Sequence, residues 1–221
     1  MRVLEIINLT ENLFQLNLEP GELSSSFQIP GQYVVISLEN QKPIYMVIAS
    51  NIGATNWSFL IRDANASTKI LKELKVGDSI SVSAAQGKGY PIEKLVNKNV
   101  ILFSAGTGLA AFYSVIGKII SARQDFKKVI LMHGSRLESE LPYREEMIKW
   151  VENEIEVFVT LSQPEDSWAF YEGHVQEILK NEKLKLNTYS ALICGPNQMM
   201  KDVTEAAESY GLLKNNIFTN Y

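Results

Sequence analysis

Short apolar segments separated by turn residues occupy roughly the first 95 residues of the chain. Apolar and polar positions partly alternate within them, as expected of strands with one buried face. A single helical pattern, at 67–74, interrupts the series. Repeated short strands with frequent turn signals are typical of a small antiparallel barrel or sandwich. The expected strands are 3–10, 13–18, 32–38, 43–50, 57–63 and 79–84.

The rest of the chain has a different pattern, in which nearly continuous apolar runs alternate with amphipathic helical stretches. Strands that are buried on both faces have this composition, so the pattern predicts an α/β doubly wound parallel sheet. The change of pattern lies between residues 90 and 97, and we expect two domains, 1–95 and 96–221. The expected strands are 99–105, 129–134, 155–162 and 190–195, and the expected helices are 109–123, 143–151, 175–181 and 198–210.

Composition excludes several classes of function. The 221 residues carry a formal net charge of −4, which argues against a nucleic-acid partner. The single Cys194 and the two histidines make an internal disulfide or a metal site unexpected. No apolar run is long enough for a membrane span, and Glu5 and Glu11 interrupt any secretory signal. We therefore expect a soluble protein of the cytoplasm or another reducing compartment.

A glycine motif, Gly106-Thr107-Gly108, follows the first expected strand of the second half and opens a helix. Glycines at such a turn let the backbone approach a diphosphate, which the amide groups of the following helix can bind. The alternative is a tight turn without a ligand. The position between strand and helix favours nucleotide binding.

Two other motifs are ambiguous when taken alone. Cys194-Gly195-Pro196 ends the last expected strand, where ligands bind in doubly wound folds, but it is equally compatible with a buried thiol followed by a turn. Ser67 and Thr68 begin the helix of the first half. Such residues either cap the helix or contact a phosphate there, and on its own the cap is favoured.

Taken together and in order, the motifs resemble those of the ferredoxin–NADP(+) reductase superfamily. The resemblance covers nearly the whole chain. Within the superfamily the plant pKIWI502-like branch is the most similar, through Lys42-Pro43 and the LSQP stretch at 161–164. The matching motifs are PGQY at 30–33, IAS at 48–50, ST at 67–68, GKGYP at 87–91, GTG at 106–108, HGSR at 133–136, YREE at 143–146 and CGP at 194–196.

This resemblance implies a Greek-key antiparallel β-barrel that binds FAD, followed by an α/β domain that binds NAD(P)H. It implies a flavin-dependent oxidoreductase that transfers hydride from NAD(P)H to FAD and then electrons to a carrier. The expected partner is a small ferredoxin-like carrier protein or a larger redox complex. A non-catalytic or flavin-poor nucleotide-binding subunit of an electron-transfer complex is the alternative.

The resemblance also implies which residues form the sites. Cys194 would lie near the nicotinamide, and the C-terminal Tyr221 would cover the flavin, although an ordinary packed tail is an equal alternative for Tyr221. The cofactor-binding candidates are Tyr45, Met46 and Val47 on the flavin strand, Ser67 and Thr68 at the flavin diphosphate, and Gly106, Thr107, Gly108, Ser135, Arg136, Ser162, Gly195, Pro196 and Met199 for the nicotinamide nucleotide.

The flavin strand departs from the family pattern Arg-x-Tyr-Ser, because Ile44, Tyr45, Met46 and Val47 occupy its four positions. The arginine and the serine are missing, and the aromatic residue is displaced by one position. A shift of one residue turns a side chain to the other face of a strand. Either a bulge returns Tyr45 to the flavin, or Met46 packs there instead. Gln163 also stands where the family has an arginine that binds a 2′-phosphate; Arg136 and Lys201 are the other possible partners, but the absence of an arginine cluster slightly favours NADH over NADPH.

Overall fold

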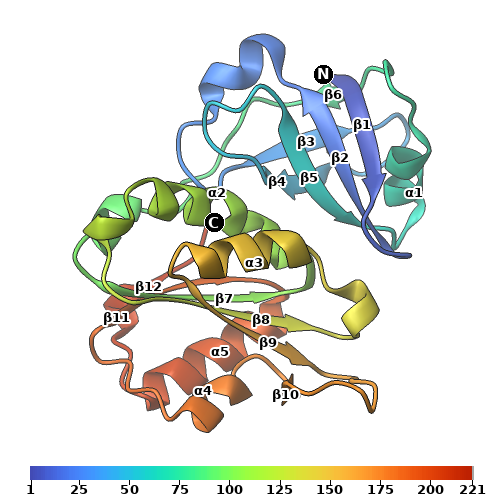
Figure 1. The fold of residues 1–221 in the computed structure, drawn as a ribbon. Helices are drawn as coiled ribbons and strands as arrows, with labels where there is room; N and C mark the ends of the chain where they lie inside the picture. The colour runs from blue at the N-terminus through green and yellow to red at the C-terminus, as the bar shows by residue number, and fades with distance from the viewer. Residues whose placement is uncertain (221) are drawn as a thin grey trace. The chain divides into compact units, whose positions relative to one another are not determined.

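The computed structural model describes residues 1–220, which divide into two compact units (Figure 1). The first contains residues 1–90, 110–117 and 220, and the second contains residues 91–109 and 118–219. Division of the chain into domains at residues 95 and 96 stays a prediction. Tyr221, predicted to cover the flavin, lies outside the described residues.

Two antiparallel sheets form the first unit. One has the order β1-β2-β5 and the other β4-β3-β6. Both contribute to one hydrophobic core, in which Phe14, Val34 and Phe59 are fully buried. The bounds are β1 (Arg2–Asn8), β2 (Leu13–Glu19), β3 (Tyr33–Ser37), β4 (Ile44–Val47), β5 (Trp57–Arg62) and β6 (Ser81–Val82), with η1 (Gly21–Ser26) and α1 (Ala66–Glu73).

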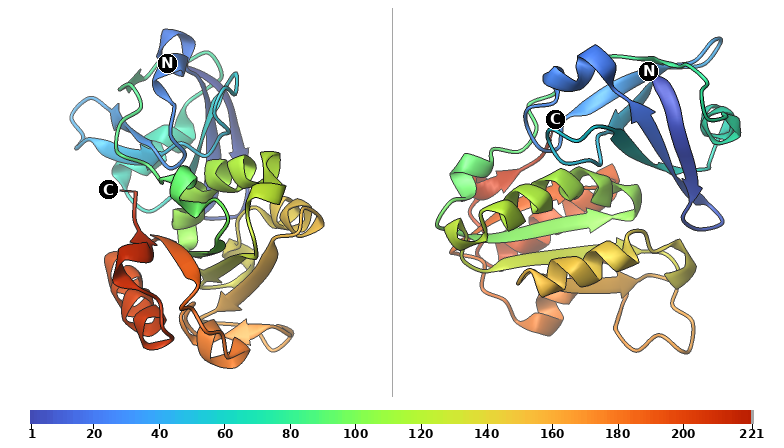
Figure 2. Two further views of the ribbon diagram at one scale, coloured as in Figure 1. Left: turned by 90° about the vertical axis from the view of Figure 1, so that its left-hand side faces the viewer. Right: turned by 45° about the horizontal axis from the view of Figure 1, so that its top comes forward.

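A six-stranded parallel sheet forms the second unit, in the order β10-β9-β8-β7-β11-β12. Helix α3 (Arg144–Glu152) lies on one face, and α4 (Glu177–Glu182) and α5 (Asn197–Ser209) lie on the other (Figure 2). Together with the first unit's sheets, this arrangement confirms the predicted fold class. The strands are β7 (Asn99–Ala105), β8 (Val129–Ser135), β9 (Glu156–Leu161), β10 (Tyr171–Glu172), β11 (Tyr189–Cys194) and β12 (Ile217–Phe218).

Connecting elements complete the chain. Helix α2 (Ala110–Ser121) follows β7 through the short turn η3 (Gly106–Leu109). The remaining 3-10 turns are η2 (Ile92–Leu95), η4 (Arg123–Asp125), η5 (Glu138–Glu140) and η6 (Lys214–Asn216). No helix within residues 1–220 has the length and apolar character needed to cross a lipid bilayer.

The strand order places a topological switch point between β7 and β11. From β7 the chain adds β8 and then β9 on one side of the sheet, whereas β11 pairs with the other side of β7. Because the connections diverge there, the carboxyl ends of β7 and β11 flank the position where doubly wound sheets bind ligands. The glycine motif at 106–108 and Cys194-Gly195 therefore follow the two strands at this point.

The outer edge of β9 is only partly covered. Strand β10 pairs with Thr160 and Leu161. Within residues 1–220, the segment from Glu156 to Val159 has no strand partner on that side. A groove of about 630 Å³ lies at the amino ends of β8 and β9 and is lined by Lys128, Glu156 and Phe158, among others.

Candidate functional site

The two glycines of the turn after β7 have different structural roles. Gly106 has a φ of +55°, in the left-handed region, and a side chain added there would point into open space. At Gly108 an added Cβ would lie 2.5 Å from the carbonyl oxygen of Cys194. Gly106 thus leaves room beside the turn, whereas Gly108 lets the turn pack against the end of β11. The sequence prediction assigned both glycines to the diphosphate and did not foresee this packing.

The end of β11 lies directly beside the end of β7. Cys194 is buried and pairs in register with Ser104, and a Cβ on Gly195 would meet the backbone nitrogen of Ala105 at 3.4 Å. The same Cβ would be 2.9 Å from Sδ of Met199, in the first turns of α5. The structure therefore brings Cys194, Gly195 and Met199 together with the glycine turn. Pro196 stands immediately before α5.

A buried polar pair links β7 to its neighbour β8. Ser104 Oγ and His133 Nδ1 are 2.8 Å apart, and both residues are fully buried. Burial lowers the pKa of His133 to about 3, so that the imidazole is neutral at physiological pH. Sequence reasoning included His133 only as part of a motif. The available signal was a polar residue near the carboxyl end of each of two largely apolar strands.

Beyond His133, the end of β8 presents Ser135 and Arg136. Ser135 is 6% exposed, and its hydroxyl has no hydrogen-bond partner within the part of the chain that the structure describes. Its carbonyl accepts a hydrogen bond from the backbone N–H of Ser162, at 3.0 Å. Arg136 donates to Glu140, at 2.7 Å. The predicted residues Ser135, Arg136 and Ser162 are therefore neighbours at the carboxyl ends of β8 and β9.

An aromatic loop joins β9 to β10. The rings of Trp168 and Phe170 are in edge contact, with centroids 5.0 Å apart, and Phe170 is 70% exposed. The indole N–H of Trp168 donates to the carbonyl of Tyr171, and the Tyr171 hydroxyl donates to Glu182. The hydrogen bond to Glu182 raises the pKa of Tyr171. The loop thus exposes one aromatic ring and holds the other two by hydrogen bonds.

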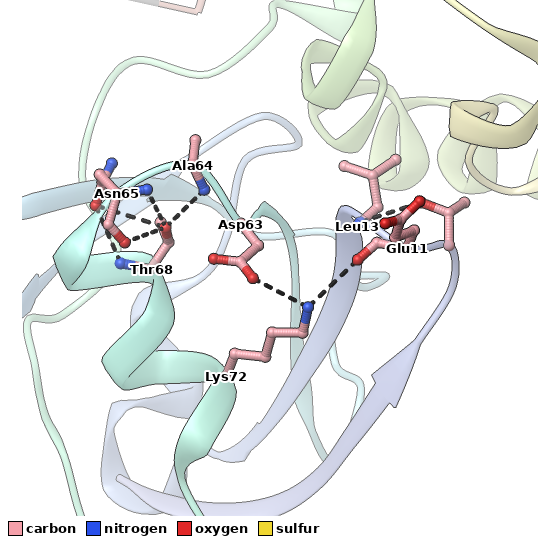
Figure 3. Close-up of polar contacts among 8 residues, drawn as sticks. Glu11, Leu13, Asp63, Ala64, Asn65, Thr68 and Lys72 are labelled. Atoms are coloured by element: carbon pink, nitrogen blue, oxygen red, sulfur yellow. Dashed lines mark hydrogen bonds and ion pairs between the residues drawn. The ribbon is translucent and has the colours of Figure 1, made fainter.

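At the start of α1, Asn65 is the N-cap residue, and Thr68, three positions later, completes the cap (Figure 3). The Thr68 hydroxyl accepts from the backbone N–H groups of Ala64 and Asn65, both at 3.0 Å, and the N–H of Thr68 donates to Oδ1 of Asn65. This reciprocal arrangement is a capping box. Ser67 instead donates to the side chain of Gln41, at 2.9 Å. The geometry of Thr68 matches the cap that the motif favoured when taken alone, and contact of either residue with a flavin diphosphate stays a prediction.

One of the two lysines of α1, Lys72 in its last turn, also has partners. Lys72 donates to Asp63, at 3.0 Å, and to the carbonyl of Glu11 (Figure 3). These contacts hold α1 against the β1–β2 turn and the end of β5. Lys72 is therefore a structural residue and not a free charge beside the helix start.

Strand β4 contains no bulge. Its pairing with β3 is continuous, from Tyr33 opposite Val47 to Ile36 opposite Ile44. Met46 packs against the core of the first unit, and Tyr45 is 68% exposed on the outer face. The Tyr45 ring lies 5.8 Å from the ring of Tyr33, between centroids. Of the two predicted alternatives, a returning bulge is not observed.

Tyr33 has a fixed position in this outer face. Gly87 has a φ of +89°, and a Cβ there would be 2.7 Å from the Tyr33 ring. The ring therefore lies against the backbone of Gly87 on one side and contacts Tyr45 on another. With Val35 and Val47, which alternate to the same face, the two tyrosines form an apolar surface on β3 and β4.

Known proteins with similar sequences include nucleotide-binding oxidoreductases. Residues 102–205 match the oxidoreductase NAD-binding domain family. The gamma subunit of sulfhydrogenase 1 from Pyrococcus furiosus is 27% identical over 225 residues, which cover 99% of this chain and 77% of that protein. The fruit protein pKIWI502 from Actinidia deliciosa is 26% identical over 227 residues, covering 94% and 71% respectively.

Solved structures share the fold of the whole described chain. A ferredoxin NADP+ reductase from Neisseria gonorrhoeae, with bound FAD and NADP, has a TM-score of 0.85 at 19% identity and covers 99% of this chain and 96% of its own. The cytochrome b5 reductase domain of Ulva prolifera nitrate reductase has a TM-score of 0.84 at 17% identity, covering 99% and 95%. The predicted resemblance to the ferredoxin–NADP(+) reductase superfamily is confirmed.

Proposed function

We propose that this chain, similar in fold and motif order to ferredoxin–NADP(+) reductases, is an NAD(P)H-dependent flavin reductase. FAD would bind to the first unit and NAD(P)H at the carboxyl ends of β7 and β11. One observation carries the proposal: Gly106 has a positive φ and open space beside it at the switch point of the parallel sheet. This turn lies within the segment that matches the oxidoreductase NAD-binding domain family.

The residues around the turn fit a dinucleotide. Gly106 and Thr107 would contact the diphosphate, which needs close approach of the backbone and tolerates no side chain at Gly106. Gly108 permits the turn to sit against the end of β11. The nicotinamide would then lie beside the end of β11, with contacts from Cys194, Gly195, Pro196 and Met199.

The adenosine half would lie toward the ends of β8 and β9. The hydroxyl of Ser135, which has no hydrogen-bond partner among residues 1–220, can bind a ribose hydroxyl there, with Ser162 beside it. Glu140 pairs with Arg136 and offsets its charge. Since a 2′-phosphate needs uncompensated positive charge, and Gln163 offers none, these contacts support NADH as the preferred nucleotide.

The first unit offers two features that fit FAD. The apolar surface with Tyr33, Tyr45 and Val47 can cover a planar ring, as aromatic side chains do in offset stacking. Ser67 and the N–H groups of Ala66 and Ser67 can meet the diphosphate, since early N–H groups of a helix lack helical partners and favour anions, whereas the N–H of Thr68 is bound by Asn65. When bound, FAD supplies an acceptor for hydride that can release electrons singly.

A second candidate function is a flavin-poor nucleotide-binding subunit. Ile44 and Val47 replace the arginine and serine of the family pattern, so one charge and one hydroxyl toward FAD are missing. The similarity to a sulfhydrogenase gamma subunit supports a place in a larger redox complex for either function. A small ferredoxin-like carrier is the other electron acceptor that we propose.

An absorption spectrum of the purified protein tests the proposal, recorded without oxygen before and after separate additions of NADH and NADPH. We expect a near-stoichiometric flavin spectrum that NADH bleaches faster than NADPH does. A protein that stays colourless after addition of FAD and reduces no dye with either nucleotide would refute the enzyme. If that protein still binds NADH, the second candidate function is supported.

A further inference from the structure

The second unit's sheet contains one buried polar rung between β7 and β8. Four apolar pairs precede it, from Val100 opposite Val129 to Phe103 opposite Met132. Ser104 then stands opposite His133, and the pair is joined by the 2.8 Å contact between Oγ and Nδ1. The last pair, Ala105 opposite Gly134, ends the ladder.

Placing an imidazole in this environment is unfavourable for stability. Both residues are fully buried, and Nε2 of His133 has no hydrogen-bond partner within residues 1–220. Two apolar side chains would fill the same space without a desolvation cost. The pair therefore calls for an explanation other than stability, and buried polar pairs are best attested as devices that specify register.

The rung can specify register because a shifted strand would break it. A slip of one residue between β7 and β8 would turn side chains to the opposite face and leave both buried polar groups unpaired. The four apolar rungs have this property to a lesser degree, because one apolar contact can substitute for another. The Ser104–His133 rung adds a polar constraint on the alignment of these two strands.

The position of the rung connects it to the nucleotide site. Ser104 stands two residues before Gly106, and His133 stands two residues before Ser135. The turn η3 and the end of β8 both follow directly from it. Holding the two strands in register at this point fixes the spacing between the glycine turn and Ser135.

We propose that the Ser104–His133 hydrogen bond locks the register of β7 and β8 and thereby positions the glycine turn for the nucleotide. His133 is a positioning residue in this scheme and does not touch the ligand. The identity of the ligand, NAD(P)H, rests on the proposed function. The claim that the hydrogen bond orders the glycine turn does not depend on which ligand binds there.

The test compares four variants of the full chain. Ser104→Ala and His133→Leu each break the hydrogen bond, and the pair Ser104→Val with His133→Leu removes it without leaving an unpaired polar group. His133→Asn is the matched control, since its amide can place a hydrogen-bonding atom near the position of Nδ1. NADH titration and amide hydrogen exchange of residues 105–109, measured without nucleotide, are the two measurements.

We expect the three disrupting variants to raise the dissociation constant for NADH by roughly five- to tenfold, as one lost hydrogen bond does. Exchange at residues 105–109 should accelerate by a similar factor. Ser104→Ala and His133→Leu remove the same hydrogen bond, so each should have the same effect on the turn. The effect of the paired variant on the turn should therefore equal that of one single variant and not the sum of the two. His133→Asn should stay close to the original protein in both measurements.

The paired apolar variant distinguishes positioning from stability, because it keeps the core filled. If its thermal midpoint is retained while NADH affinity and protection of the turn fall, the proposal holds. Unchanged affinity and exchange in folded variants would overturn it, even if the single variants are less stable. If the original protein binds no NADH but the turn still loses protection, the proposed function fails and the register lock stands.

Discussion

At the scale of single residues, the two glycines of the turn after β7 should respond differently to substitution. Gly106→Ala places a side chain in the left-handed region, at a cost of about 1–2 kcal/mol, and fills the space proposed for the diphosphate. We expect the dissociation constant for NADH to rise on the order of tenfold, with unfolding only modestly affected. Isothermal titration and urea unfolding measure the two effects.

Gly108→Val is the comparison for that prediction. Its Cβ would overlap the backbone of Cys194, which cannot move as a flexible side chain would. We expect a loss of about 1–3 kcal/mol in the free energy of unfolding together with weaker NADH binding. Unchanged NADH affinity in Gly106→Ala, or unchanged stability in Gly108→Val, would contradict the separate roles assigned to these glycines.

Cys194 provides a second prediction at this scale. If its thiol lies beside the nicotinamide, Cys194→Ser should slow reduction of the bound flavin by NADH more than it weakens NADH binding, because it acts at the reacting end of the nucleotide. Rapid-mixing kinetics over a range of NADH concentrations separates the rate from the dissociation constant. A variant with weak binding and an unchanged limiting rate would remove Cys194 from that position.

At the scale of elements, the outer face of β3 and β4 predicts how the flavin is held. Tyr45→Ser removes an exposed ring, and we expect the dissociation constant for FAD to rise roughly two- to tenfold, the value of an aromatic pair. Val76→Ser is the matched control, since Val76 is 73% exposed elsewhere in the same unit. Fluorescence titration of the flavin-free protein checks both. An equal effect of the two substitutions would assign the flavin ring to another surface.

Some of these elements could be predicted from the sequence and others could not. Strands and helices longer than about five residues follow from local periodicity, and the predicted order of elements corresponds to the observed one. The two-residue strands β10 and β12 carry no periodic signal and were not predicted. The face of the sheet on which Tyr45 lies is set by the continuous pairing of β4 with β3. The sequence of β4 alone does not reveal whether that pairing contains a bulge.

The same limit applies to the candidate site. The glycine turn and Cys194 were predicted because each follows an apolar strand. Ser104 and His133 are 29 residues apart, and only the pairing of β7 with β8 places them in contact. The packing of Gly108 against β11 likewise depends on the order of the strands in the sheet. The family resemblance implied that order, but the periodicity of the sequence did not.

At the scale of the whole molecule, the buried histidine predicts an acid-sensitive stability. His133 is neutral in the folded protein, with its pKa lowered from 6.5 to about 3, whereas the unfolded chain binds a proton below pH 6.5. This group therefore costs the fold no pH-dependent stability above pH 6.5, and the free energy of unfolding falls as the pH drops from 6.5 toward 3. From this group alone we expect a loss of about 2 kcal/mol between pH 7 and pH 5.

Urea unfolding at pH 7 and pH 5 measures that loss. The variant with Ser104→Val and His133→Leu is the reference, because it lacks the titrating group and keeps the apolar core. The original protein should lose more stability than the variant by about 2 kcal/mol. Parallel losses in the two proteins would mean that His133 is protonated in the folded state.

The open edge of β9 has a consequence for behaviour at high concentration. An unpaired strand edge can accept a strand from another molecule, which is how many soluble β-proteins begin to aggregate. In the uncovered part of β9, Glu156 is paired with Lys128 at 2.9 Å, and charged side chains at such a position hinder the approach of a second strand. Because both side chains are well exposed, we expect the pair to add little to the stability of the fold, and its main effect to be to hinder strand addition at this edge.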